Sequence, residues 1–446
     1  MEFVIKISQF LLSLSLLIVL HELGHFIPAK LFKTKVEKFY LFFDVKFSLF
    51  KKKIGETVYG VGWLPLGGYV KIAGMIDESM DKEQMAQPPK PWEFRSKPAW
   101  QRLIIMLGGV TVNFILAYVI YVFMSFIYGD ADVRVDSLKD GYWIEHPVLN
   151  EVGLQTGDKV LKINNYDIIN DSDIGQYIIE AKSITIDRNG EKKRFDLPED
   201  FLGQLSSSKN KDLFEYRVPF MVAEIADSSA NFKSDIKQKD IITSIDGKEL
   251  KYFDQLGSIV EGKENQNLPA VILRDDQVIE TSLSLDKNGK LGIRPYRVNP
   301  KFEDMGYYDV FRKEYTFGES FVAGGKKFTK TIKNYFGQLK AIFSPSTGAY
   351  KGLGGFKAIY DQFSSVWSWS YFWGLTAFLS IMLAILNLLP IPALDGGHVM
   401  FLLYEMVSGR KPSEKFLERA QIVGFFILIA LVLFANGNDI FKAITN

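Results

Sequence analysis

Two histidines four residues apart, His21 and His25, stand with Glu22 in the motif HELGH. Side chains at this spacing lie on one face of a helix, so both imidazoles can bind one metal ion. Glu22 can then act as a general base on a water molecule that the metal activates. The motif ends an apolar run, where ionisable groups are costly and usually functional. It therefore indicates a catalytic metal site rather than a helix end whose histidines face solvent.

A second polar motif, NLLPIPALDGGH, ends a later apolar run and begins at Asn387. An α-helix rises about 1.5 Å per residue, so Lys6 and His21 are about 22 Å apart and Tyr371 and Asn387 are about 24 Å apart. If both runs enter the membrane from the same side, the two motifs reach the same depth. This match is the physical reason to join them in one site.

Asp395 in the second motif is the predicted third metal ligand, because two prolines end the preceding helix and free the chain to turn. Two histidines and one carboxylate leave a fourth position for water, as in catalytic zinc sites. The alternative is that Asp395 caps the N-terminus of a helix over residues 397–407. Asn387 can donate a hydrogen bond to the tetrahedral oxyanion or to the substrate backbone. His398 is expected to cap or support the site rather than to bind the metal.

The composition limits the kind of metal site and the kind of partner. The 446-residue chain has no cysteine, so zinc must be bound by His, Asp or Glu. Three of its four histidines lie in the two motifs. The formal net charge of +1 argues against nucleic-acid binding, since such proteins are usually basic. The length predicts two or more domains.

Four apolar runs are long enough to cross a bilayer as helices, and they are predicted in residues 1–30, 102–128, 371–390 and 414–436. The first run could instead be the core of a signal peptide with Lys6 as its positive flank, but no small-residue cleavage site follows it. Lysine-rich loops at residues 31–101 and 391–413 favour the cytoplasmic side of the membrane. The segment between the second and third runs is then expected outside the cytoplasm.

Small and polar residues interrupt the second apolar run at Gly108, Gly109 and Asn113. Glycines allow helices to approach closely. Asn113 can line the interior of the helix bundle, but a hydrogen bond that packs two helices together is its expected role.

The loop at residues 31–101 contains the segment ETVYGVGWLPLGGYVKIAG, whose alternating pattern predicts a β-hairpin with Gly67-Gly68 as its turn. Such a hairpin beside a membrane can re-enter it or offer an edge to a substrate strand. An ordinary surface hairpin explains the composition equally well.

Two similar β-rich modules are predicted at residues 129–204 and 213–297. Each has an acidic turn before a short strand (GDKVLKIN and KDIITSID), then a short helix and a hairpin, which indicates an internal duplication. Residues 199–212 between them are predicted to be a linker. Residues 298–370 are amphipathic, with apolar residues at helical spacing from Phe321 to Phe336. This helix can lie on the membrane surface or pack on the two modules, and both readings remain open.

The segments HELGHF, PLGGYVKIAG, PWEFRSKPAWQRLIIMLGGVTVNFILA and NLLPIPALDGGH together resemble the site-2 protease family of intramembrane zinc metalloproteases. In the order and spacing of these motifs the chain is most similar to the bacterial regulator of sigma-E proteases. The resemblance implies four transmembrane helices with a membrane-associated β-hairpin, and two tandem PDZ-like domains. It further implies Zn²⁺ bound by His21, His25 and Asp395, with Glu22 as the catalytic residue. Substrate contacts are implied for Asn387, Gly67, Gly68 and Tyr69.

The resemblance also implies a cellular location and the proteins on which the chain acts. The expected location is a bacterial inner membrane, with the PDZ-like domains on the periplasmic side. The expected substrates are single-span membrane proteins such as trimmed anti-sigma factors and remnant signal peptides, and the PDZ-like domains are expected to bind peptide C-termini. Three stretches depart from the family pattern, FYLFFDVKF, LGGFKAIY and SDIKQKD, which weakens the inference about gating and about peptide binding by the second module.

Two rival functions are a membrane-anchored scaffold with a vestigial metal site and a metal or ion transporter. The scaffold predicts that Glu22→Gln leaves function intact, and the transporter predicts metal flux without proteolysis. Four spans without an inverted repeat count against transport.

Overall fold

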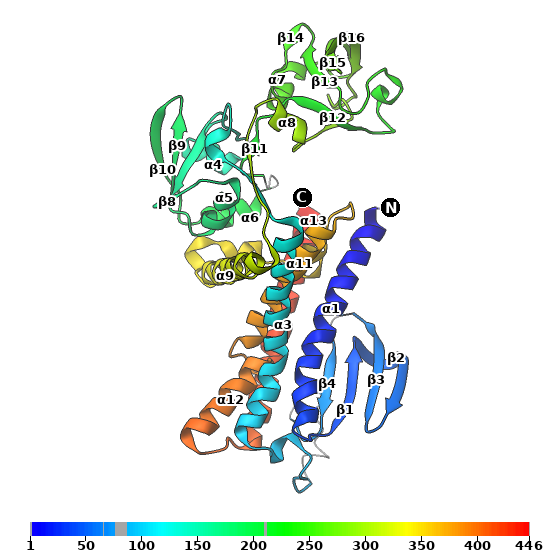
Figure 1. Cartoon of the computed structure of the whole chain (residues 1–446), viewed down its shortest axis with the longest axis vertical. Coiled ribbons are helices and arrows are strands. Elements are labelled where there is room, and N and C mark those ends of the chain that lie inside the picture. Colours follow the sequence, from blue (N-terminus) through cyan, green and yellow to red (C-terminus); the bar gives the residue numbers. More distant parts are fainter. Residues whose placement is uncertain (1, 66, 76–86, 209–211, 446) are drawn as a thin grey trace. The chain divides into compact units, whose positions relative to one another are not determined.

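The computed structural model describes residues 2–65, 67–75, 87–208 and 212–445 (Figure 1). The chain divides into two compact units. One consists of residues 1–129, 314–339 and 353–446, and the other of residues 130–313 and 340–352.

Four helices among the described residues are long and apolar enough to cross a membrane, and they cover the four predicted spans. They are α1 (Glu2–Leu31), α3 (Ala99–Tyr128), α11 (Trp369–Leu388) and α13 (Glu414–Thr445). Ser368 begins α11 by accepting a hydrogen bond from the Tyr371 backbone N–H, and Pro390 follows its end. The first unit is therefore built around apolar helices.

Helices α1 and α3 cross at a point where only glycine fits. A Cβ atom on Gly108 would lie 1.9 Å from the carbonyl oxygen of Gly24, so the two backbones touch. Helix α11 packs on both through buried hydroxyl groups: Ser13 and Thr376 are hydrogen-bonded at 2.9 Å. These contacts bring α1, α3 and α11 together (Figure 1).

The cytoplasmic loop of the sequence prediction forms a four-stranded sheet in the order β2-β3-β1-β4. Its strands are β1 (Val36–Leu41), β2 (Phe43–Ile54), β3 (Thr57–Leu64) and β4 (Tyr69–Ile72). The predicted hairpin with Gly67-Gly68 as its turn is wrong, because β3 and β4 do not pair with each other. Strand β1 lies between them, parallel to β3 and antiparallel to β4. The hairpin of this sheet is β2–β3, and β4 is an edge strand next to α1.

Three further α-helices lie in the described part of this region. Helix α9 (Phe317–Ile342) is the predicted amphipathic helix, and Phe328 and Ile332 on one of its faces pack on α3 and α11. This face of α9 therefore packs on the apolar helices α3 and α11. Helix α12 (Asp395–Ser408) follows α11, and α10 (Phe356–Asp361) contacts α13.

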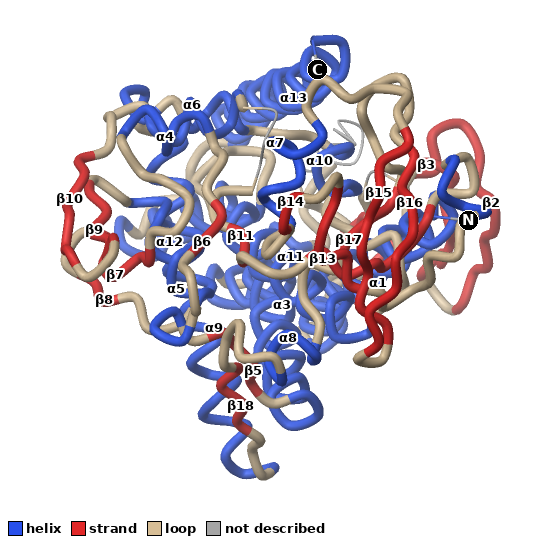
Figure 2. Tube along the Cα trace, turned by 90° about the horizontal axis from the view of Figure 1, so that it is seen from above, coloured by secondary structure: helices blue, strands red, loops and turns tan. Residues whose placement is uncertain are grey.

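The second unit contains two β modules that share part of their strand order. The first has β7 (Lys159–Ile163), β8 (Tyr166–Asp167), β9 (Ser183–Arg188) and β10 (Glu191–Asp196) in the order β10-β9-β7-β8, and helices α4 (Pro147–Val152) and α5 (Asp171–Tyr177). The second has β12 (Phe220–Ile225), β13 (Ile241–Ile245), β14 (Lys248–Glu249), β15 (Asn267–Arg274), β16 (Gln277–Ser284) and β17 (Ile293–Pro295), with helix α7 (Leu256–Val260). Strands β13, β15 and β16 lie side by side, as β7, β9 and β10 do (Figure 2).

One buried ion pair is repeated in both modules. Asp158 binds Arg188 at 2.7 Å and also accepts the backbone N–H of Gln155 at 2.9 Å. Asp240 binds Arg274 at 2.7 Å and accepts the backbone N–H of Lys237, again at 2.7 Å. Both carboxylates are 1% exposed. The same residues in the same places support an internal duplication.

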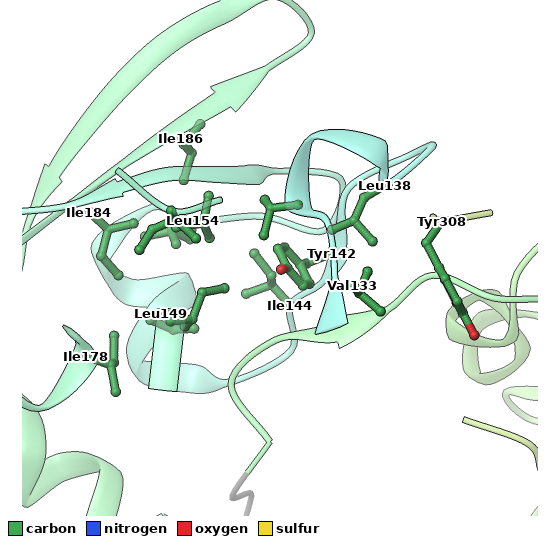
Figure 3. Packing of buried hydrophobic residues seen from close by; sticks show 14 of the residues in the cluster. Val133, Leu138, Tyr142, Ile144, Leu149, Leu154, Ile178, Ile184, Ile186 and Tyr308 are labelled. Carbon is green, nitrogen blue, oxygen red and sulfur yellow. The ribbon is translucent and has the colours of Figure 1, made fainter. Parts of the chain in front are cut away.

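The core of this unit extends beyond the predicted module boundaries. Tyr142 lies among Val133, Leu138 and Ile144, and Tyr308 packs at the edge of the same cluster (Figure 3). Residues 298–313, predicted as part of the juxtamembrane region, thus belong to this unit. Their elements are α8 (Pro300–Asp304) and β18 (Val310–Lys313), which pairs with β5 (Asp130–Val133).

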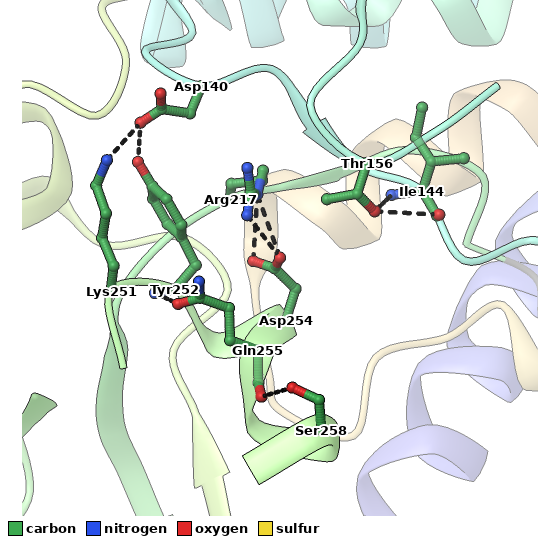
Figure 4. A network of polar contacts seen from close by, with 9 residues as sticks. All are labelled: Asp140, Ile144, Thr156, Arg217, Lys251, Tyr252, Asp254, Gln255 and Ser258. Carbon is green, nitrogen blue, oxygen red and sulfur yellow. Dashed lines mark hydrogen bonds and ion pairs between the residues drawn. The ribbon is translucent and has the colours of Figure 1, made fainter. Parts of the chain in front are cut away.

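The linker predicted at residues 199–212 is partly wrong. Helix α6 (Phe201–Ser207) occupies half of it, and Phe201 is buried in the core; residues 209–211 lie outside the described part. Short strands β6 (Tyr142–Trp143) and β11 (Glu215–Tyr216) pair with each other. Lys251 and Tyr252 of the second module both bind Asp140 of the first, and within the second module Arg217 binds Asp254 at 2.9 Å (Figure 4).

Candidate metal centre

Helix α1 and the start of α12 bring three predicted ligands together. The Nε2 atoms of His21 and His25 are 3.2 Å apart. Asp395 Oδ2 lies 3.3 Å from each of them. Both imidazoles are buried, and the carboxylate is 16% exposed.

This triangle has the dimensions that zinc requires. Ligand bonds of 2.0–2.1 Å in a tetrahedral site place the ligand atoms about 3.3–3.4 Å apart. Asp395 Oδ2 is buried, and although it faces the two imidazole nitrogens at 3.3 Å, it makes no hydrogen bond of good geometry within the described part of the chain. A buried carboxylate oxygen without a partner is costly, and a cation at this point would remove the cost. The three residues therefore fit a zinc ion, with a fourth position left for water.

The chain between α11 and α12 turns sharply to place Asp395. Ala393 has φ of 80°, and the two glycines after Asp395 lie against the turn. A Cβ on Gly396 would lie 2.2 Å from the Leu389 carbonyl oxygen, and one on Gly397 would lie 2.6 Å from that of Ile391. Helix α12 begins at Asp395 itself with Leu394 as its N-cap, so the alternative role of Asp395 as the cap does not hold.

Helix α3 supplies the groups behind the two histidines. His25 Nδ1 lies 2.8 Å from the carbonyl oxygen of Ile105, which can only accept a hydrogen bond. The Nδ1–H of His25 therefore donates, and its Nε2 lone pair is available to a metal. On His21 the corresponding Nδ1 atom lies 3.2 Å from the side-chain amide of Asn113.

Gly109 makes room for both imidazoles. A Cβ atom at this position would lie 2.4 Å from His25 Nε2 and 2.6 Å from His21 Cε1. The sequence suggested helix packing for Gly109 and, for Asn113, either a place in the interior or, as the favoured role, a helix-packing hydrogen bond. The available signal was their spacing of four residues, which puts both on one face of α3, but nothing local shows that this face meets the histidines.

A cavity of about 480 Å³ opens onto the three ligands. Glu22 lines it together with Val70 of β4, whose backbone interacts with the Glu22 carboxylate. Gly68 and Tyr69 also line the cavity, and a Cβ on Gly68 would lie 3.4 Å from Glu22 Cγ. The catalytic glutamate of the prediction and the edge strand thus face the same space.

The remaining predicted residues lie at different distances from the ligands. The amide nitrogen of Asn387 is 3.4 Å from His21 Nε2, so Asn387 reaches the metal position. Gly67 packs instead against the ring of Phe43, at 3.0 Å from where its Cβ would be. His398 lines the cavity beside Asp395, as expected for a supporting residue.

Tyr69 is held in place by stacking and by a charged pair. Its ring stacks on Tyr40 with centroids 5.3 Å apart, and its hydroxyl donates to Asp44 at 2.8 Å. Lys38 lies 3.6 Å from the same carboxylate. Burial opposes ionisation of Asp44, but the Tyr69 hydrogen bond and the Lys38 charge outweigh it and hold its pKa below the usual value.

Known proteins match the chain along nearly all of its length. A family model described as "Peptidase family M50" matches residues 9–431. Curated relatives named "Putative zinc metalloprotease" include one from Campylobacter jejuni, 27% identical over 97% of this chain and 92% of the relative. Others are from Vibrio cholerae, 26% identical over 96% and 97%, and Borreliella burgdorferi, 28% identical over 96% of each chain.

Proposed function

Since the chain belongs to peptidase family M50 and is a zinc metalloprotease, we propose that it cuts single-span membrane proteins within their transmembrane segments. One observation carries this proposal. His21 and His25 lie on α1, and Asp395 follows the end of α11 by a few residues; α1 and α11 are both long and apolar enough to cross a membrane. A site built on such helices reaches substrates that lie in the bilayer.

The protein groups around the site suit peptide hydrolysis. When bound, zinc supplies Lewis-acid polarisation of a carbonyl oxygen and activation of water. Glu22 takes the proton of the attacking water and delivers it to the leaving amine. Its place next to His21 in the chain and on the cavity wall fits this task. Asn387, within reach of the same point, donates a hydrogen bond to the oxyanion.

The edge strand β4 is the proposed binding site for the substrate backbone. A peptide in a helix hides its carbonyl groups, so the substrate must unwind before it is cut. An extended segment can add to the edge of a sheet through main-chain hydrogen bonds. The contact of Glu22 with the Val70 backbone supports this placement, because a strand bound at β4 would carry its peptide bonds past Glu22.

The β modules of the second unit are proposed to be PDZ-like domains on the periplasmic side of a bacterial inner membrane. There they bind peptide C-termini and exclude substrates that still carry a folded outer domain. Basic residues in the loops at 31–101 and 391–413 support this orientation. Trimmed anti-sigma factors and remnant signal peptides are the proposed substrates.

The test is co-expression with a single-span reporter that lacks its outer domain. Glu22→Gln should abolish cleavage, and Glu2→Gln, an exposed glutamate in the same helix, should leave it unchanged. Cleavage by Glu22→Gln at the parental rate would refute the protease and favour a scaffold. Metal flux into vesicles without cleavage by the parent protein would favour a transporter.

A further inference from the structure

Asn113 is a completely buried amide in the middle of α3, and its side chain faces the ring of His21. Its Nδ2 atom lies 3.2 Å from His21 Nδ1, whereas its Oδ1 atom has no hydrogen-bond partner among the residues that the structure describes. A buried amide oxygen in this state is unusual, since most buried polar side-chain atoms are hydrogen-bonded. The mechanism above does not use this group.

The chemistry of a histidine ligand says which atom of Asn113 must face the ring. A neutral imidazole carries one N–H, so Nδ1 must hold the hydrogen if Nε2 binds the metal. His25 meets this requirement, because its Nδ1 faces the carbonyl oxygen of Ile105 at 2.8 Å. His21 needs an acceptor in the same place, and the only oxygen that Asn113 can offer there is Oδ1.

Turning the amide by 180° provides that acceptor. The nitrogen and oxygen of an Asn side chain have nearly the same shape, so their assignment follows from the hydrogen bonds. With Oδ1 toward the ring, Asn113 accepts from His21 Nδ1–H. With Nδ2 toward the ring, His21 must carry its hydrogen on Nε2, which faces Asp395 Oδ2 at 3.3 Å and is then blocked as a ligand.

We infer that Asn113 is a positioning residue that fixes His21 with its hydrogen on Nδ1, and so makes Nε2 a zinc ligand. The inference rests on the zinc site of the proposed function and adds a group outside the ligand set. The backbone of Asn113 is itself held, because Ser380 Oγ in α11 donates to its carbonyl oxygen at 2.8 Å. Helix α3 therefore orients both histidines, His25 through a main-chain carbonyl and His21 through a side chain.

The test measures zinc affinity of the full-length protein in detergent, by competition with a chelating indicator. Asn113→Leu keeps the size of the side chain but removes the acceptor, and it should weaken zinc binding about 10- to 100-fold. Asn113→Asp keeps an oxygen at the same position and should retain affinity close to that of the parent. Asn113→Ala provides a second variant without the acceptor if the leucine prevents folding.

A matched control is Ser125→Ala, which removes another fully buried polar group from α3, about 18 Å further along the helix. It should bind zinc as the parent does. The cobalt-substituted proteins provide a second readout, since the ligand-field bands of Co²⁺ should change in Asn113→Leu and be restored in Asn113→Asp.

Two results separate this inference from the zinc site itself. If His21→Ala still binds one zinc with parental affinity, the site is wrong and the inference with it. If His21→Ala loses zinc but Asn113→Leu and Asn113→Ala bind it as the parent does, the site stands and the role of Asn113 is refuted. Equal weakening in Asn113→Asp and Asn113→Leu would also refute it.

Discussion

Replacing Gly109 by alanine adds a single methyl group where α3 lies against the two histidine ligands. This methyl group would lie 2.4 Å from His25 Nε2 and 2.6 Å from His21 Cε1. Non-bonded atoms prefer separations of about 3.5 Å or more, so the imidazoles or the helix must move by about 1 Å. The substitution therefore acts on the ligands without changing any of them.

The size of the effect follows from this displacement. A metal site tolerates shifts of about 0.2 Å in its ligand distances, and a misplacement of about 1 Å at a catalytic centre can lower the rate about 100-fold. We expect Gly109→Ala to lower both the zinc affinity and the rate of reporter cleavage about 100-fold. Overpacking should cost only about 1–3 kcal/mol of stability, so the protein should remain folded.

The assay compares zinc content, cleavage of the trimmed single-span reporter and melting temperature in detergent. Gly437→Ala is the matched control, because it adds a methyl group to another apolar helix, α13, where no described atom lies within 4 Å of the new Cβ. Parental zinc affinity and cleavage in Gly109→Ala would show that the histidines do not sit against α3 in the way that the structure places them.

Four further predictions concern other parts of the molecule. Gly68→Ala, whose Cβ would lie 2.5 Å from Ile18 and close to the edge strand, should slow reporter cleavage and leave zinc affinity unchanged. Zinc at 100 times its dissociation constant should stabilise the folded protein by about 2.7 kcal/mol and so raise its melting temperature. In His25→Ala, added zinc should no longer raise the melting temperature. The pKa of Asp44 is lowered in the folded state, so the Asp44 carboxylate stabilises the fold above its ordinary pKa of about 3.9. This stabilisation is lost as the pH falls below that value. The difference in melting temperature between the parent and Asp44→Asn should therefore shrink on acidification. Asp240→Asn breaks a buried ion pair and should cost about 3 kcal/mol in a denaturant titration, whereas Arg294→Ala, at an exposed pair, should cost less than about 1 kcal/mol.

The features that could be read from the chain are those set by neighbouring residues. The i, i+4 spacing of His21 and His25 places both on one helix face wherever that helix lies. The length of the apolar runs and the rise per residue put Asn387 and the HELGH motif at one depth. Two prolines end the helix that carries Asn387, and this depth match then predicts Asp395 as the third ligand. Asp395 Oδ2 lies 3.3 Å from the Nε2 atom of each histidine.

The β sheet shows where local reasoning fails. The alternation of residues at 57–72 predicts two strands, and β3 and β4 are found there. Their partners are not a local property, because β1, which is earlier in the chain, inserts between them. A turn of two glycines permits a hairpin but does not require one. The core residue Phe201, predicted to lie in a linker, is a second case, since its burial depends on core residues that are distant in the chain.

The residues behind the metal ligands depended entirely on the packing of distant segments. Ile105, Gly109 and Asn113 are separated from the HELGH motif by most of a hundred residues, and in the sequence they belong to an ordinary apolar helix. Their roles arise because Gly24 and Gly108 let α1 and α3 touch at one point. Helical spacing selected the metal ligands, whereas the contact between two helices decided how those ligands are held.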